Sequence, residues 1–301
     1  MLKKIPLPIT GVMLGFAALG NLLQSYSDTL RLGCGIIATF IGLIILLKII
    51  FYPKQWVEDM QQPITASVFG TFSMAIMLLS VYAKPLIGKN AVIIWYIGLA
   101  IHILLILYFT FKFVLKFDLK KVFASYFIIY VGIAVASVSA PAFEQTLIGT
   151  YAFWFAFITF ILLLFVVGYR YLKYRDIPEP ARPLFCIFTA PMSLCLAGYI
   201  QSVSPKSKAF IIGMAIIAFL LFVLVLIFLI RFLKLKFYPS YAAFTFPFVI
   251  SAIAMKQTNA FLQMQDIKVR GLTTLILLET ILAAVLVLYA FTRYLMNIFK
   301  K

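Results

Sequence analysis

Side chains that could carry out chemistry are sparse in this chain. Its 301 residues include a single histidine, His102, three cysteines and nine acidic residues. Cys34, Cys186 and Cys195 are separated by long apolar stretches, where free cysteine usually behaves as a small hydrophobic side chain. These numbers argue against a structural zinc site, a disulfide framework and a catalytic cluster. We therefore expect no bound metal, no cofactor and no enzymatic activity.

Glu279 and Lys256 lie inside apolar stretches long enough to span a membrane, and both are candidates for function. Glu279 follows Leu277 and Leu278, and an acid at membrane depth is costly unless it is paired or used. The sequence leaves open a role in transport and a hydrogen bond to a neighbouring helix or subunit. Lys256 lies toward the end of another stretch, where it either attracts anions to a pore mouth or extends its amine to the interface. His102, alone on its stretch, is expected to be structural.

The elements that must position these residues are transmembrane helices. The chain is 64% hydrophobic and 12% charged, and its mean hydropathy is +1.09, whereas soluble domains are about half apolar and a quarter charged. The net charge of +17 does not indicate nucleic-acid binding, because the basic residues lie between apolar stretches, as in cytoplasmic loops. A hydrocarbon core of about 30 Å requires roughly 20 helical residues. The sequence therefore predicts an all-α integral membrane protein with ten transmembrane helices.

The predicted helices alternate between two kinds. One kind, rich in small residues and containing eight of the 13 prolines, covers residues 6–25, 63–82, 123–142, 183–202 and 239–258. The other kind, rich in Leu, Ile and Phe, covers residues 33–52, 91–111, 150–169, 209–230 and 271–291. Small residues let helix backbones approach closely, and proline is tolerated where protein or water satisfies the freed carbonyl groups. We therefore expect the first kind to be inner helices and the second kind to be outer helices that face lipid.

An internal repeat relates pairs of these helices. Residues 8–10 (Pro-Ile-Thr) recur at 63–65, and residues 188–191 (Phe-Thr-Ala-Pro) are echoed by 244–247 (Phe-Thr-Phe-Pro). A period near 57 residues divides one transmembrane domain, 1–301, into repeats of about 5–61, 62–120, 121–177, 178–235 and 236–301. Because two helices return the chain to its starting side, the five repeats are parallel and related by rotation about the membrane normal. Five inner helices around one axis suggest a pore, and a solid bundle is the alternative.

The distribution of lysine and arginine predicts the orientation. With both termini cytoplasmic, 18 basic residues lie inside and 8 outside, as the positive-inside rule requires. The stretch from Lys3 to Gly20 looks like a signal peptide, but it is also the first copy of the repeat, so we expect it to be retained. The sequence therefore predicts a multi-pass protein of the plasma or inner cell membrane.

Three motifs carry a resemblance to a known family. They are residues 9–19 (ITGVMLGFAAL), Pro178-Glu179-Pro180 leading to Ala190-Pro191, and residues 243–247 (AFTFP). The chain resembles, over nearly its whole length, the tellurite-resistance and C4-dicarboxylate transporter family, which includes bacterial tellurite-resistance proteins and the slow-type anion channels of plant guard cells. The resemblance implies ten helices, five of them around a pore, in a trimer with one pore per protomer. It also implies a phenylalanine that plugs the pore from the ninth helix, which by position is Phe246.

The chain departs from the family pattern in its inner helices. The family often has proline midway along the first, third and fifth helices of the chain, which are inner helices, where this chain has Met13, Ser73 and Ile129, so kinks at these places remain open. The residues predicted to line or kink the pore are Thr10, Gly15, Thr65, Ser73, Thr189, Pro191, Thr245 and Pro247, with Phe246 as the gate. Without the resemblance, Phe246 could equally fill space in the core.

The predicted pore contains no charge in its middle. Without acids it has no means of selecting cations, and without bases it holds no anion tightly. Selection by the cost of dehydration favours large monovalent anions, so a passive anion channel is the favoured function. The alternative is a proton-coupled transporter of C4-dicarboxylate, sulfite or tellurium oxyanions, for which only Glu279 and His102 could relay protons. The expected partners are inorganic or small organic anions, membrane lipid and two further copies of the chain in a homotrimer.

Overall fold

The computed structural model describes residues 2–300, and within that range the chain contains helices and no β-strand. Six helical stretches are long and apolar enough to cross a membrane: Asp28–Phe51, Pro63–Val114, Thr146–Lys173, Glu179–Ser202, Lys208–Leu233 and Leu272–Phe299. Helices satisfy their own backbone hydrogen bonds, which a segment inside lipid must do. The chain is therefore a multi-pass helical membrane protein, as predicted.

The segments predicted as inner helices form six α-helices and two long 3-10 segments. The α-helices are α1 (Ile9–Leu23), α4 (Pro63–Ile87), α6 (Tyr126–Tyr130), α7 (Ala134–Ser139), α9 (Ala190–Ser202) and α11 (Phe246–Gln263). The 3-10 segments η6 (Glu179–Thr189) and η7 (Pro239–Phe244) lead into α9 and α11. Pro191 and Pro247 lie in the first turn of α9 and α11, where a missing N–H needs no helical partner. These prolines therefore begin α-helices after 3-10 segments. They do not bend continuous helices, so the expected kink at Pro247 is absent.

The segments predicted as outer helices form long helices with one exposed face. They are α2 (Asp28–Phe51), α5 (Ala91–Phe109) with a π-helical extension η3 (Thr110–Val114), α8 (Thr146–Lys173), α10 (Lys208–Leu233) and α12 (Leu272–Phe299). A short helix, α3 (Pro53–Met60), connects α2 to α4. Within the most apolar window, 28% of residues are buried in α8 and in α10, against 89% in the stretch that contains α9. Most of their exposed large hydrophobic side chains are Leu, Ile and Phe, which suit lipid.

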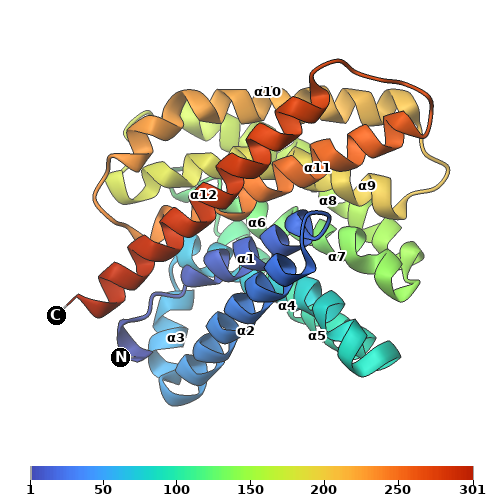
Figure 1. Ribbon diagram of the computed structural model, residues 1–301. Helices are drawn as coiled ribbons and strands as arrows, with labels where there is room; N and C mark the ends of the chain where they lie inside the picture. Colours follow the sequence, from blue (N-terminus) through green and yellow to red (C-terminus); the bar gives the residue numbers. More distant parts are fainter. Residues whose placement is uncertain (1, 301) are drawn as a thin grey trace.

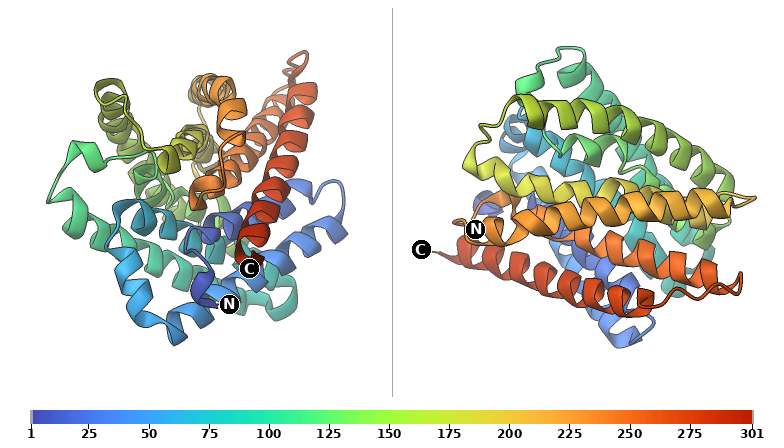
Figure 2. Two further views of the ribbon diagram at one scale, coloured as in Figure 1. Left: turned by 90° about the vertical axis from the view of Figure 1, so that its left-hand side faces the viewer. Right: turned by 90° about the horizontal axis from the view of Figure 1, so that it is seen from above.

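The inner helices form a closed ring. Around it α1 contacts α4, α4 contacts α6 and α7, α7 contacts α9, α9 contacts α11, and α11 returns to α1. Each outer helix packs on the inner helix that precedes it in the chain: α2 on α1, α5 on α4, α8 on α7, α10 on α9, and α12 on α11. Figure 1 shows α12 crossing the molecule beside α11 and close to α1, and Figure 2 shows both chain ends on the same side.

Two glycines allow the ring to close between the first and last inner helices. A Cβ atom on Gly11 would lie 2.8 Å from the Cβ atom of Ala242, and one on Gly15 would lie 2.6 Å from the Cβ atom of Thr245. This spacing of four residues between small residues is typical of close helix contacts in membranes. The hydroxyl of Thr245 donates a hydrogen bond to the carbonyl oxygen of Gly11 at 2.8 Å. The contact holds the backbone directly before Phe246.

The third inner element is interrupted between α6 and α7 although it contains no proline there. His102, on α5, is fully buried, with Nε2 3.0 Å from the carbonyl oxygen of Ile129 and Nδ1 2.8 Å from the hydroxyl of Ser73. Since a carbonyl only accepts, Nε2 carries the proton and caps the end of α6. A Cβ atom on Gly132 would lie 2.1 Å from a backbone oxygen, so the turn requires glycine. A histidine and a glycine thus accompany the break near Ile129, while α1 and α4 run unbroken through the other two positions that lack proline.

Candidate functional site

Two cavities lie inside the ring of inner helices, because side chains from all parts of the ring line both of them. The large cavity has a volume of about 890 Å³, and its walls include Gly11, Thr71, Met74, Phe127, Val131, Ile187, Ala190, Leu194 and Phe246. The small cavity has a volume of about 370 Å³, and its walls include Ala18, Asn21, Val81, Val138, Leu194, Gln201, Phe246, Ile250 and Gln257. Their axis is therefore the axis of the ring.

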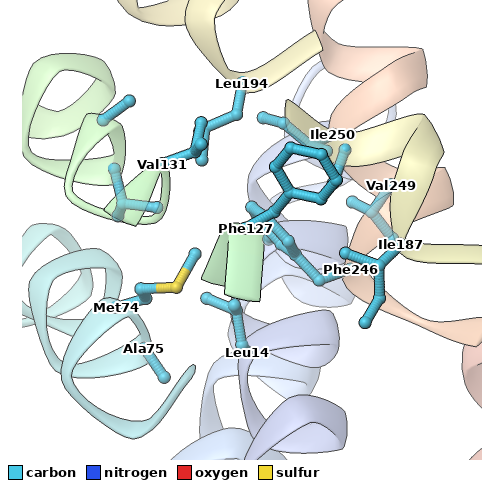
Figure 3. Close-up of a cluster of buried hydrophobic side chains, with 14 of the residues drawn as sticks. Leu14, Met74, Ala75, Phe127, Val131, Ile187, Leu194, Phe246, Val249 and Ile250 are labelled. Carbon is cyan, nitrogen blue, oxygen red and sulfur yellow. The ribbon is translucent and has the colours of Figure 1, made fainter. Parts of the chain in front are cut away.

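The cavities meet at two residues, because Leu194 in α9 and Phe246 in α11 line both. Phe246 is 6% exposed and Leu194 is 2% exposed, so little open space separates their side chains from their neighbours. Apolar side chains from every part of the ring converge at this level, as Figure 3 shows together with Phe246. We call five of them the collar: Leu14, Met74, Val131, Leu194 and Ile250. Apolar side chains therefore separate the two cavities.

Charged side chains line the large cavity only at its rim. Three lysines, Lys112, Lys116 and Lys121, and one acid, Asp118, belong to its walls, and all four lie in the connection between α5 and α6. Asp118 forms a salt bridge with Lys121 at 3.6 Å, so it does not neutralise the charges of Lys112 and Lys116. Among the residues that the structure describes, no charged residue lines the small cavity. The rim therefore concentrates anions, and the interior holds no fixed charge.

Four of the predicted site residues line the cavities. Thr65, Pro191 and Pro247 belong to the wall of the large cavity, and Phe246 belongs to both walls. All four lie in or directly before the first turns of α4, α9 and α11. The large cavity is therefore built in part from the N-terminal ends of these three inner helices.

Four other predicted residues lie behind the wall. The hydroxyl of Thr10 donates to the carbonyl oxygen of Leu7 at 3.0 Å, and that of Thr189 donates to the carbonyl oxygen of Cys186 at 2.9 Å. The hydroxyl of Thr245 is bonded to α1, and Gly15 packs against Thr245. Threonine in a helix commonly turns its hydroxyl to a carbonyl three or four residues earlier. These residues close the ring and do not present hydroxyl donors to the cavities.

Ser73 and Lys256 also point away from the cavities. Ser73 is buried on the side of α4 that faces His102 and α5. The amine of Lys256 donates to the carbonyl oxygen of Leu22 at 3.1 Å and to the hydroxyl of Ser25. It therefore caps the end of α1, where the carbonyl groups of a helix lack partners, and lies beside the small cavity without lining it.

Glu279 links α12 to α11 through a side-chain hydrogen bond, as a structural role requires. Its side chain is buried, and its Oε2 atom accepts a hydrogen bond of 2.9 Å from Ser251 on α11. Its Oε1 atom has no hydrogen-bond partner. Glu279 lines neither cavity. Both titratable residues that could relay protons, Glu279 and His102, therefore lie between an inner and an outer helix.

Several residues that line the cavities were not predicted from the sequence. Asn21, Gln201 and Gln257 are carboxamides near the ends of apolar inner helices, and a polar side chain in such a helix is a usable signal. Leu194 and Thr71 carry no such signal, because leucine and threonine occur throughout these helices.

Comparison with known proteins bears on the function of these cavities. Residues 4–292 match the SLAC1 family model, which is described as voltage-dependent anion channel. No curated protein matches the chain. The match covers the whole ring of inner helices and both cavities.

Proposed function

Since the chain belongs to the SLAC1 family of voltage-dependent anion channels, we propose that it is a passive anion channel whose pore is closed by the side chain of Phe246. Family membership makes transport of anions across a membrane its function. The finer assignments to a passive mechanism, a pathway and a gate rest on the cavities inside the ring of inner helices.

The observation that carries the gate is the position of Phe246 between the two cavities. An anion that enters the large cavity meets a collar of hydrocarbon with no hydrogen-bond donor to replace its water. Moving an unpaired charge into such surroundings costs many kcal/mol, so the pathway is closed while the collar is dry. Phe246 is bulkier than Leu194, the other residue that both cavities share. Displacement of the Phe246 side chain therefore joins the two cavities.

The pathway runs through ten spans in five parallel repeats, 5–61, 62–120, 121–177, 178–235 and 236–301. The closed ring of contacts among the inner helices supports this arrangement. The lysine-rich rim of the large cavity, with Lys112, Lys116 and Lys121, is placed in the cytoplasm together with both termini. The resemblance noted in the sequence supports a homotrimer in the cell membrane, with one pore per protomer, and a role in tellurite resistance.

The passive mechanism is supported by the positions of the titratable residues. A proton-coupled transporter needs a group that gains and loses a proton in contact with the substrate pathway. Glu279 and His102 bond to Ser251 and to Ile129 behind the walls, and no relay connects them to either cavity through the described residues. We therefore favour a channel over the coupled transport of dicarboxylate, sulfite or tellurium oxyanions.

Electrophysiology on the purified protein in planar bilayers tests the proposal. Chloride, nitrate and a dicarboxylate are exchanged on one side at constant pH, and then a pH gradient is imposed at constant chloride. A channel gives a reversal potential that follows the permeant anion gradient and does not move with the pH gradient. A reversal potential that shifts with the pH gradient indicates proton coupling and contradicts the passive mechanism.

A further inference from the structure

Five residues of the small cavity occupy one equivalent position in the five inner elements. Each lies seven residues after a residue of the collar: Asn21 after Leu14, Val81 after Met74, Val138 after Val131, Gln201 after Leu194, and Gln257 after Ile250. Seven residues are two turns of an α-helix, a rise of about 10 Å with a rotation of about 20°. In α1, α4, α9 and α11, residues so spaced lie on the same face of one continuous helix, whereas in the third inner element Val138 lies in α7 and Val131 in the turn before it. All five residues line the small cavity. They form a second level beyond the collar.

This second level is polar on three of its five positions. Asn21, Gln201 and Gln257 bring one carboxamide each from α1, α9 and α11, which are consecutive around the ring. The other two positions are valines. We call the three carboxamides the amide ring. A carboxamide offers two N–H donors and one carbonyl oxygen without a net charge, so either an anion or a cation could in principle use it.

In two of these side chains the carbonyl oxygen is either hydrogen-bonded or buried. The Oδ1 atom of Asn21 accepts a hydrogen bond of 3.5 Å from Nε of Arg31 on α2. The Oε1 atom of Gln257 is buried and has no hydrogen-bond partner, so it is out of contact with the cavity space. The amide nitrogen is then the polar atom that each side chain has left to present there. These donors suit an anion.

Positive charge behind the amide ring also favours an anion. Arg31 bonds to Asn21 itself, and Lys256, the residue before Gln257, bonds to the end of α1 through Leu22. Both cations lie outside the cavity wall. They raise the potential in the small cavity without offering an anion a direct ion pair that would trap it.

We propose that Asn21, Gln201 and Gln257 form a coordination site for a partly dehydrated monovalent anion, such as chloride or nitrate, which the pore crosses between the collar and the outside. The site rests on the proposed function, since it acts on anions that pass the collar. Its N–H donors replace part of the hydration shell. Small, strongly hydrated anions gain most from such donors, so the site reduces the preference for large anions that dehydration alone would impose.

The experiment measures the ratio of thiocyanate to chloride permeability in bilayers. All variants carry Phe246→Ala, so that the collar does not limit the current. Methionine resembles glutamine in length and lacks the donors, so Gln201→Met with Gln257→Met removes two of the three amides. We expect the ratio to rise roughly threefold or more, because lost hydrogen bonds to an ion penalise chloride most. If the double variant yields no protein, each single variant should raise the ratio by a smaller factor.

The matched control is Gln263→Met, which removes an exposed carboxamide at the end of α11 that lines neither cavity. Its ratio should equal that of the Phe246→Ala parent. An equal rise in this control, or no rise in any of the amide-ring variants, overturns the assignment of the site to the amide ring.

A change of charge provides a second test that does not depend on small ratios. Gln257→Glu places a carboxylate in the amide ring and should lower chloride current at least tenfold. Asn259→Glu, two residues further along α11 and in neither cavity wall, should leave it near the parent value. Chloride current that survives Gln257→Glu unchanged overturns the site and leaves the channel standing. A Phe246→Ala parent without any anion-selective current overturns the channel, and the site with it.

Discussion

Phe246→Ala is the substitution that most directly separates a gate from a core residue. The change removes the ring that divides a cavity of about 890 Å³ from one of about 370 Å³. The backbone around it is held independently, because Thr245 is bonded to Gly11 of α1 and Pro247 begins the first turn of α11. The expected product is one continuous cavity through the ring of inner helices, wide enough to hold water at the level of the collar.

The size of the effect follows from the barrier that the ring imposes. A reduction of about 3 kcal/mol in the barrier raises a rate about 100-fold, since about 1.4 kcal/mol corresponds to a factor of ten. Dehydrating a charge in hydrocarbon costs more than this, so we expect anion current to increase by about 100-fold or more. The loss of stability should remain below the roughly 3–5 kcal/mol typical of a core phenylalanine, because Phe246 already borders open space on two sides.

The assay is chloride current per reconstituted protein in planar bilayers, together with the thermal unfolding midpoint in detergent. Phe244→Ala is the control, because Phe244 is fully buried, packs on Tyr241 with ring centroids 4.8 Å apart and lines neither cavity. It should lower the midpoint without raising current. Wild-type current from well-folded Phe246→Ala protein would refute the gate, as would a rise in current of similar size in the Phe244→Ala control.

Three further predictions concern residues away from the collar. Glu279→Gln should keep the anion current and its pH dependence, because glutamine can still accept the hydrogen bond of Ser251; proton-driven uptake that disappears in this variant would instead support a coupled transporter. A cysteine replacing Leu86 should react with an impermeant thiol reagent applied outside the cell and one replacing Ile177 should not, and the reverse pattern would overturn the orientation. His102→Leu should destabilise the protein by about 1–3 kcal/mol, because the carbonyl oxygen it caps is left buried and unpaired; an unchanged unfolding midpoint would show that the break after α6 does not depend on this histidine.

Several features were predictable from the sequence. Apolar stretches of about 20 residues predict helices in a membrane whatever their neighbours are, because lipid offers the backbone no other partners. Small residues and proline marked the buried helices, among them α9 and α11, and the motifs around Ala190 and Phe246 indicated the family that the match over residues 4–292 confirms. Each of these signals is local, so it survives in the sequence by itself.

Other features depend on contacts that no local pattern encodes. The break near Ile129 forms without a proline, and a histidine from α5 caps the carbonyl oxygen that the break leaves free. Thr10, Thr189 and Thr245 were expected at the pore, yet their hydroxyls are bonded behind its wall.

The rotation of each inner helix about its own axis is what only the tertiary structure decided. Successive residues turn by about 100°, so a shift of one residue in that rotation exchanges the wall of a cavity for the contact with a neighbouring helix. The rotation is set where distant repeats meet, as at Gly11 and Thr245, which lie 234 residues apart. Hydrophobicity therefore determined which segments are helices in a membrane, and small residues and proline determined which of these helices are buried. Packing between the first and last repeats determined that Phe246 and Gln257 face the axis while Thr245 does not.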